Sequence, residues 1–263
     1  MAETMEQWDA AAKDYQRVAK LGLNEYNSRL LRFWGEKGMI FPGARVLDIG
    51  CGVGKYGAYL AELGCDVTLT DISGEMLRHA QENMTRFSTP WAVYQCNFDE
   101  VSGEERVFSK GFDLSISTMS PAVHDVLTVR KMSAMTHGWC FLARFSSWRQ
   151  PTRDEFLKCL GFPGQPPRQG MGKDSEDIVK AIADAGFKPE LENVDYNWSD
   201  TRTAEEFADY MLRRTDALAG FERQKALDCA KALSKDGVIE DAVYTKVDWI
   251  YWKSEEENDS RAV

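Results

Sequence analysis

Apolar residues along this chain follow two alternating patterns. Short aliphatic and β-branched runs, such as those at 46–49 and 67–70, predict buried strands. Longer segments with apolar residues at every third or fourth position predict amphipathic helices between them. This alternation predicts an α/β fold with a doubly wound, mostly parallel seven-stranded sheet and helices on both faces. The expected strands begin at 45 and lie at 66–70, 91–96, 112–117, 139–145, 187–196 and 243–252.

Local capping chemistry places several helix boundaries. Ser73 is expected to cap a helix over 74–86. Thr203-Ala-Glu-Glu206 has the pattern of a capping box for a helix that continues to 218. The other expected helices are 5–20 and 22–37, which form a helical cover over 1–40, the later part of 45–63, 124–136, a helix from 176 to Gly186, and 220–235.

The length of 263 residues allows one large core, so we expect a single domain over 1–254. The stretches 146–173 and 197–240 are expected to be insertions on the substrate side. The end of the chain, 255–263, is charged and lacks large apolar residues, which predicts disorder. The first residues show neither the basic start nor the apolar stretch of a signal peptide, and no run reaches the ~20 apolar residues of a membrane span.

Residues 46–57, VLDIGCGVGKYG, carry the strongest functional signal. An apolar strand that enters a glycine-rich turn and then a helix is how open α/β sheets build nucleotide sites. A phosphate-binding P-loop is excluded, because Lys55 is followed by Tyr56 rather than by Ser or Thr. A dinucleotide site remains an alternative: Gly52, Gly54 and Gly57 have GxGxxG spacing, with an acidic residue at the end of the next strand.

Asp48 argues against the dinucleotide alternative, because a carboxylate beside the loop would repel a pyrophosphate. The same carboxylate suits a ligand with an ammonium and a sulfonium group. Asp71 ends the next apolar run, VTLTD, where it can accept hydrogen bonds from both hydroxyls of a ribose.

The DxGCGxG motif, followed about twenty residues later by an acidic strand end, resembles the class I S-adenosylmethionine-dependent methyltransferases of small-molecule type. The similarity extends over 8–145. It implies a Rossmann-like fold, with S-adenosylmethionine as cofactor. It also implies that a tyrosine of the N-terminal helix covers the methionine end of the cofactor, that Met76 lies against the adenine, and that Asn97 replaces the usual adenine-binding Asp. The cofactor residues implied are Tyr15, Asp48, Gly50, Cys51, Gly52, Gly54, Asp71, Ile72, Met76, Asn97, Phe98 and Met119.

His124 is the candidate catalytic base. The segment TMSPAVHD at 118–125 begins where the fourth strand ends, beside the expected position of the methyl group. A histidine there could take a proton from a hydroxyl, thiol or amine. The alternative is a structural histidine at a helix start, bonded to the backbone. His79 and His137 are interpreted as structural.

Residues 146–173 interrupt the alternating pattern with many Pro, Gly and Arg residues. Five basic side chains against two acidic ones favour either a lid for an anionic small-molecule substrate or a solvated connector. The basic residues are Arg149, Arg153, Lys158, Arg168 and Lys173. Aromatic residues that follow strands at the crevice edge, Trp148, Tyr196 and Trp198, are the candidate acceptor-binding residues.

The net charge and the cysteine and histidine content narrow the range of possible functions further. A net charge of −10 argues against a general nucleic-acid binder. Six cysteines without a CxxC pair are interpreted as buried thiols of a cytoplasmic protein, and three scattered histidines offer no metal site. The sequence therefore predicts methyl transfer from S-adenosylmethionine to a small molecule. Two alternatives are an NAD-dependent oxidoreductase and a module that binds S-adenosylmethionine without turnover.

Overall fold

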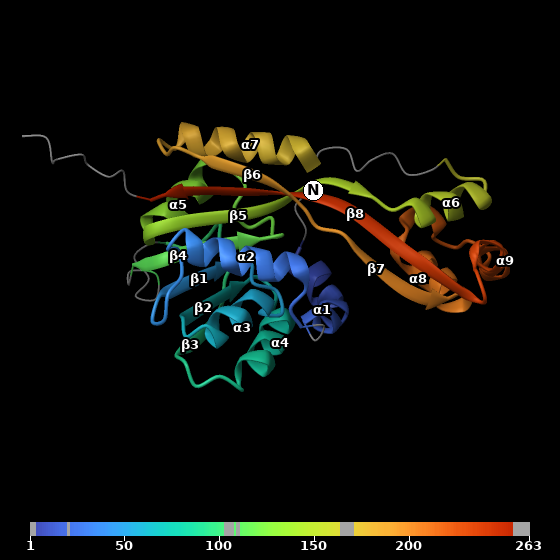
Figure 1. Ribbon diagram of the computed structural model, residues 1–263, viewed down its shortest axis with the longest axis horizontal. Helices are drawn as coiled ribbons and strands as arrows, with labels where there is room; N and C mark the ends of the chain where they lie inside the picture. Colours follow the sequence, from blue (N-terminus) through green and yellow to red (C-terminus); the bar gives the residue numbers. More distant parts are fainter. Residues whose placement is uncertain (1–3, 20–21, 103–107, 109–110, 164–170, 255–263) are drawn as a thin grey trace, which may run out of the picture. The chain divides into compact units, whose positions relative to one another are not determined.

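The computed structural model describes residues 4–19, 22–102, 108, 111–163 and 171–254. Its strands form one eight-stranded sheet in the order β3-β2-β1-β4-β5-β8-β6, with β7 paired to β8 (Figure 1). The strands are β1 Arg45–Ile49, β2 Asp66–Asp71, β3 Trp91–Gln95, β4 Phe112–Thr118, β5 Thr136–Arg149, β6 Glu190–Asp195, β7 Trp198–Thr203 and β8 Val238–Lys253. The helices are α1 Met5–Ala19, α2 Glu25–Glu36, α3 Lys55–Glu62, α4 Gly74–Met84, α5 Val126–Ala134, α6 Pro151–Cys159, α7 Met171–Asp184, α8 Ala204–Arg214 and α9 Arg223–Leu233, with a 3₁₀ turn η2 at Asp216–Leu218.

The Rossmann-like fold is confirmed, but the count of seven strands was too low. The missed strand, β7, pairs antiparallel with β8 from Trp198↔Val243 to Thr203↔Val238. Its sequence WSDTRT contains one large apolar residue, and its side chains alternate between half-buried and exposed. Pairing with β8, rather than burial of its own side chains, makes this segment a strand.

Parallel pairing brings the functional motifs to one edge of the sheet. Asp48 of β1 lies level with Leu69 of β2 and Ile116 of β4. The strands β1, β2 and β4 therefore end side by side, and the segments that follow them meet at their carboxyl ends. In open α/β sheets this edge is where ligands bind.

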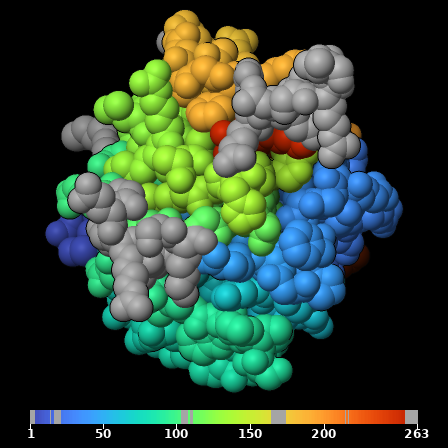
Figure 2. All heavy atoms as spheres, turned by 90° about the vertical axis from the view of Figure 1, so that its left-hand side faces the viewer, coloured from blue at the N-terminus to red at the C-terminus, as the bar shows by residue number. Residues whose placement is uncertain are grey.

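Helices cover both faces of this part of the sheet. On one face, Val129 and Met132 of α5 and Ile182 of α7 pack in a core with Leu47 and Leu142. On the other face, Trp34 of α2 meets Phe141 of β5, with ring centroids 5.2 Å apart. Figure 2 shows, on one face of the molecule, blue atoms from the N-terminal part of the chain beside lime-green atoms from the region of α5 and β5.

The chain divides into two compact units. Unit 1 comprises Met1–Arg144, Asp174–Glu192 and Asp248–Val263, and unit 2 comprises Phe145–Lys173 and Asn193–Val247. Both stretches expected as insertions, 146–173 and 197–240, fall within unit 2. The single domain over 1–254 stays a prediction, and the expected disorder of 255–263 lies outside the described residues.

Unit 2 has its own apolar core. Phe156 and Leu157 of α6 pack with Phe207 of α8 and Ala226 and Leu227 of α9. The prediction of an irregular stretch over 146–173 was therefore incomplete, because α6 occupies Pro151–Cys159. Thr203 and Glu206 do form the expected capping box at the start of α8.

A disulfide between Cys159 of α6 and Cys229 of α9 corrects the interpretation of all six cysteines as thiols. The two cysteines are 70 positions apart, so no local spacing could have indicated the pair. Cys51, Cys65 and Cys140 are buried thiols, as expected, and Cys96 is half-buried. Within the described part of the chain, no helix has the length and apolar character required to cross a bilayer.

Candidate functional site

The loop between β1 and α3, here called the glycine loop, has two positions at which a side chain would be unfavourable. Gly50 has φ of 69°, and a Cβ added there would lie 1.9 Å from Ser120 Oγ. Gly54 has φ of 73° and caps α3, and a Cβ added to it would lie 3.0 Å from Ala80 Cβ. Glycine is therefore required at both positions, and the loop presents a backbone surface free of side-chain bulk.

Asp71 closes this loop from the end of β2. Its Oδ2 accepts a hydrogen bond of 2.8 Å from the backbone N–H of Gly52, and its Oδ1 accepts one of 2.9 Å from the N–H of Ser73. Burial raises the pKa of the Asp71 carboxyl, and the two backbone hydrogen bonds oppose this shift. Each carboxylate oxygen can accept more than one hydrogen bond, so Asp71 retains acceptor capacity for a ligand.

Asp48 is the most unusual group at the site. It is fully buried, and among the described residues neither of its carboxylate oxygens has a hydrogen-bond partner. Burial, with a smaller contribution from the charge of Asp71, raises the pKa of Asp48 to about 8. A buried polar group without a partner is costly, so its presence at the base of an open glycine loop points to a ligand that supplies a donor or a positive charge.

Helix α1 covers the glycine loop. Ala12 is buried in a small apolar cluster with Val53 of the loop and Met76 of α4. Asp9 accepts hydrogen bonds from Ser73 Oγ, at 2.5 Å, and from the N–H of Glu75. The helical cover expected from the sequence is therefore attached at the start of α4, where Ser73 also caps the helix as expected.

Tyr15 lies on the solvent side of α1. It is 41% exposed, and its ring meets that of Trp8 edge-on with centroids 6.1 Å apart. Its role over the methionine end of a cofactor stays a prediction.

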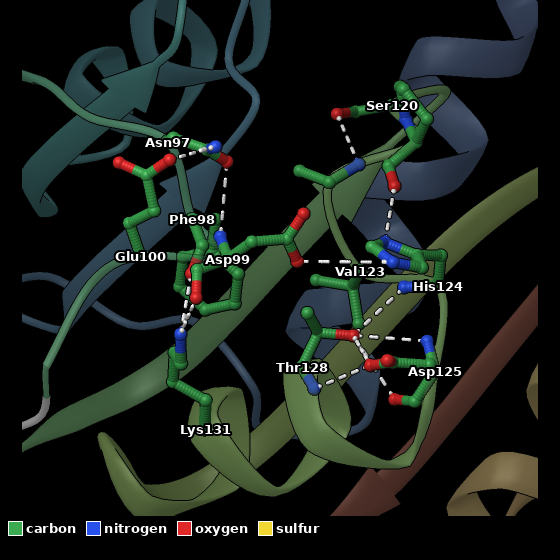
Figure 3. A network of polar contacts seen from close by, with 12 residues as sticks. Asn97, Phe98, Asp99, Glu100, Ser120, Val123, His124, Asp125, Thr128 and Lys131 are labelled. Carbon is green, nitrogen blue, oxygen red and sulfur yellow. Dashed lines mark hydrogen bonds and ion pairs between the residues drawn. The ribbon is translucent and has the colours of Figure 1, made fainter. Parts of the chain in front are cut away.

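The segment after β3 contains two residues expected to bind the cofactor, Asn97 and Phe98. Phe98 is buried, while Asn97 accepts from the N–H of Asp99 and donates to Glu100 Oε1 (Figure 3). Lys131 of α5 donates 2.8 Å hydrogen bonds to the carbonyls of Phe98 and Asp99, which fixes this segment against α5.

Three further expected cofactor residues lie near the first two strand ends. The carbonyl of Ile72 accepts a hydrogen bond from Gln95, and Met76 is 1% exposed. Cys51 is buried in the glycine loop, where desolvation raises the pKa of its thiol and keeps it protonated. Cys51 is therefore a small neutral residue at the site.

His124 lies on the segment after β4, just before α5. Its Nδ1 is 3.2 Å from the carbonyl of Pro121, and its Nε2 is 3.9 Å from Asp99 Oδ1 (Figure 3). The side chain is 52% exposed. The contact with a backbone carbonyl is what the structural interpretation expected, while an accessible Nε2 is what a base requires, so the geometry is compatible with either role.

The other two histidines make carboxylate contacts. His79 is 3.1 Å from Glu82, and His137 is 2.9 Å from Asp113. Among the described residues, no cluster of three histidine, cysteine or acidic side chains could hold a metal ion.

Unit 2 brings the expected acceptor-binding residues together. Trp148 meets Trp198 with ring centroids 5.2 Å apart, and Tyr196 lies 4.9 Å from Trp198. Phe145, which the sequence analysis missed, contacts both Trp148 and Tyr196. These four half-buried rings form the aromatic cluster of unit 2.

Three of the basic residues of 146–173 have described side chains, and these three differ in their surroundings. Arg149 is exposed and lies over the ring of Tyr244, whereas Arg153 donates to Thr215. Lys158 is exposed on α6. Arg168 lies outside the described residues, and the side chain of Lys173 also lies outside the description.

Two residues near the site were not predicted. Ser120 packs against Gly50, and Arg144 donates hydrogen bonds to three backbone carbonyls around the segment after β4. The signal for Arg144 was present in the sequence, because a cation stands between the apolar run CFLA at 140–143 and Phe145. A cation in a largely apolar strand requires a set of hydrogen-bond acceptors.

Part of the sequence is similar to known methyltransferases. Residues 46–137 match the family described as a methyltransferase domain. A malonyl-[acyl-carrier protein] O-methyltransferase from Pectobacterium atrosepticum is 48% identical over 77 residues, 28% of this chain and 30% of that protein. A ubiquinone biosynthesis O-methyltransferase from Albidiferax ferrireducens is 33% identical over 90 residues, 34% of this chain and 30% of that protein. The matches thus span less than a third of these relatives.

Solved structures share the fold across most of the chain. A phosphoethanolamine N-methyltransferase 2 from Haemonchus contortus has a TM-score of 0.54 at 16% identity, and the similarity covers 97% of this chain and 61% of that one. A methyltransferase from Bacillus halodurans has a TM-score of 0.50 at 15% identity, covering 86% of this chain and 99% of that one. At these identities the likeness concerns the fold.

Proposed function

Because residues 46–137 match a methyltransferase domain, we propose that the chain is a class I methyltransferase that transfers a methyl group from S-adenosylmethionine to a small-molecule acceptor. The observation that carries this proposal is the buried carboxyl of Asp48 beneath the glycine loop, for which the described part of the chain offers no hydrogen-bond partner. A cofactor with an ammonium and a sulfonium group would supply the missing positive charge. NAD would bring a pyrophosphate to the same place, where a carboxylate is unfavourable.

The residues present fit this cofactor. The glycine loop leaves room for a ligand against the backbone, and Asp71 can accept hydrogen bonds from ribose hydroxyls while it holds the loop. Phe98 and Met76 offer apolar surface for an adenine, with Asn97 available for polar contact. When bound, the cofactor supplies an activated methyl group on sulfur.

The protein's own task in such a reaction is mainly placement. An acceptor atom with a lone pair forms a bond to the methyl carbon while the carbon–sulfur bond breaks, and S-adenosylhomocysteine leaves. Holding the two reactants aligned in a water-poor pocket can supply an effective molarity of ~10⁵–10⁸ M. A base is needed only when the acceptor must lose a proton.

We propose that the aromatic cluster of unit 2 (Phe145, Trp148, Tyr196 and Trp198) binds the acceptor. Binding pockets are mostly apolar with a few polar groups, and four adjacent half-buried rings match that description. The exposed guanidinium of Arg149 on the same unit favours an acceptor with an anionic group.

Replacing Asp71 by Ala tests the cofactor assignment. The variant loses an acceptor for the ribose and for the N–H groups of Gly52 and Ser73. Hydrogen bonds to a charged group contribute about 1.5–3 kcal/mol each, so the affinity for S-adenosylhomocysteine should fall at least tenfold. Isothermal titration calorimetry measures the change.

Asp66→Ala, at the other end of the same strand, is the matched control and should bind S-adenosylhomocysteine like the wild type. Titration with NAD should show no binding to any of these proteins. Tight NAD binding without binding of S-adenosylmethionine or S-adenosylhomocysteine would contradict the proposed function.

Replacing His124 by Ala tests whether a base is used. We propose His124 as that base, since it follows β4 and its Nε2 faces an exposed carboxylate. Removal of a general base should lower turnover by ~10²–10⁴ and leave cofactor affinity little changed. The measurement is release of S-adenosylhomocysteine with an acceptor found by screening metabolite pools for transfer of a labelled methyl group.

A control variant, His137→Ala, removes a histidine at the amino end of β5 and should leave turnover unchanged. If His124→Ala also turns over normally, proximity and desolvation suffice, and the acceptor reacts through its own lone pair. Binding of S-adenosylmethionine without any product in such screens would instead favour a non-catalytic module.

A further inference from the structure

Arg144 is a half-buried cation whose guanidinium is bonded to backbone oxygens on both sides of one short segment. Its Nη1 donates to the carbonyl of Ser117 at 3.1 Å and to that of Ala143 at 3.0 Å. Its Nη2 donates to the carbonyl of Val123 at 2.8 Å. Ser117 is near the end of β4 and Val123 lies just before α5, so one guanidinium connects the two ends of Thr118–Ala122.

The connected segment has a strained, closely packed backbone. Met119 adopts φ of 54°, a left-handed conformation that a side chain makes unfavourable, and its N–H donates to the carbonyl of Ala143. Ser120 is buried, with Oγ in the space that a Cβ on Gly50 would occupy. The segment therefore touches the glycine loop directly, and a conformation of this kind persists only where its surroundings impose it.

We propose that Arg144 is a positioning residue that holds the segment Thr118–Ala122 in place against the glycine loop. The inference rests on the proposed function, because this segment then forms the wall of the cofactor site beside the reactive methyl group. Arg144 acts through backbone carbonyls and does not itself touch the cofactor. Its loss releases the segment, and a ligand must then order it again on binding.

An arginine is suited to this task because its planar guanidinium carries five N–H donors in a fixed arrangement. It can therefore satisfy carbonyls of different chain segments at once. Burial lowers the pKa of Arg144 to about 10, so the group remains charged at neutral pH and its hydrogen bonds remain charge-assisted. A lysine keeps the charge but cannot reproduce the fork that reaches both ends of the segment.

Hydrogen exchange combined with calorimetry tests the proposal in the full-length chain. Arg144→Lys and Arg144→Gln are compared with wild type for amide exchange of a peptide over 117–124 and for affinity toward S-adenosylhomocysteine. Arg130→Lys is the matched control, since Arg130 also donates to a backbone carbonyl, that of Asp184, but is exposed on α5.

Exchange of the 117–124 peptide should be at least tenfold faster in Arg144→Lys, and exchange in α7 and β1 should stay as in wild type. In Arg144→Gln the dissociation constant of S-adenosylhomocysteine should rise about tenfold or more, and in Arg144→Lys by less. Arg130→Lys should match wild type in both measurements. If Arg144→Gln fails to fold, Arg144→Lys still decides the question.

Wild-type exchange over 117–124 in Arg144→Lys would overturn the proposal, as would faster exchange spread evenly over the whole of unit 1. Failure of the proposed function has a different signature. In that case wild type does not bind S-adenosylhomocysteine at all, while the exchange measurement still reports whether Arg144 holds the segment.

Discussion

Asp48→Asn should raise the free energy of unfolding at pH 8 by several kcal/mol and at the same time weaken binding of S-adenosylmethionine. The pKa of Asp48 is about 8 in the folded protein, against 3.8 for an unperturbed carboxyl, because burial disfavours the charged form. One pKa unit corresponds to about 1.4 kcal/mol, so the full shift represents roughly 5 kcal/mol. An asparagine of similar shape cannot ionise and avoids this cost.

The pH dependence has a definite sign. Between pH 3.8 and about 8 the folded protein keeps the proton on Asp48 while the unfolded chain loses it. The folded state then binds more protons, so the contribution of Asp48 to stability falls as the pH rises through this range. Below it both states are protonated, and the stabilities of wild type and Asp48→Asn should converge; above it the difference should be constant.

Chemical denaturation of both proteins from pH 4 to pH 9 measures this difference. Asp99→Asn is the control, because Asp99 is about half exposed, at 53%, and should give no such pH-dependent gain. If the difference in unfolding free energy between wild type and Asp48→Asn is the same at every pH in this range, the Asp48 carboxyl is not held neutral.

Cofactor binding provides the complementary test. A sulfonium and an ammonium near Asp48 favour its ionised form, so binding of S-adenosylmethionine near pH 7 should release protons. Calorimetry in buffers with different ionisation enthalpies measures that release, and Asp48→Asn should reduce it. If Asp48→Asn both gains stability and loses affinity, the ionisable carboxyl of Asp48 lowers the stability of the protein and is retained for cofactor binding.

The glycine loop was predictable from the sequence because its chemistry is local. The turn from β1 into α3 needs glycine at Gly50 and Gly54, and the acidic end of β2 follows at a fixed distance along the chain. Parallel pairing then places Asp48 and Asp71 at the same edge of the sheet. These relations depend on strand and helix periodicity, which short-range sequence patterns carry.

The features that could not be predicted depend on contacts between distant segments. β7 becomes a strand by pairing with β8, and α6 is stable because Phe156 packs on Phe207. Arg144 finds its acceptors 21 and 27 positions earlier in the chain. Local propensity is weak for each of these segments, and tertiary packing decides their structure.

Reduction of the Cys159–Cys229 disulfide should destabilise unit 2 strongly. The bond closes a loop of 70 positions between α6 and α9. In the chain-entropy description, cross-linking a loop of this length restricts the unfolded chain by an amount worth about 4 kcal/mol. The helices α6 and α9 also contribute Phe156, Leu157, Ala226 and Leu227 to the core of unit 2, so their separation would expose apolar surface.

Hydrogen exchange in peptides from α6 and α9, with and without dithiothreitol, measures the effect together with thermal unfolding. The double variant Cys159→Ser/Cys229→Ser should unfold at the temperature of the reduced wild type and should not respond to dithiothreitol. Cys65→Ser, which removes a buried free thiol of unit 1, should keep the full response. Six titratable thiols in the non-reduced, denatured protein would show that the bond does not form, whereas four would show that it does, because the bond takes up two of the six cysteines.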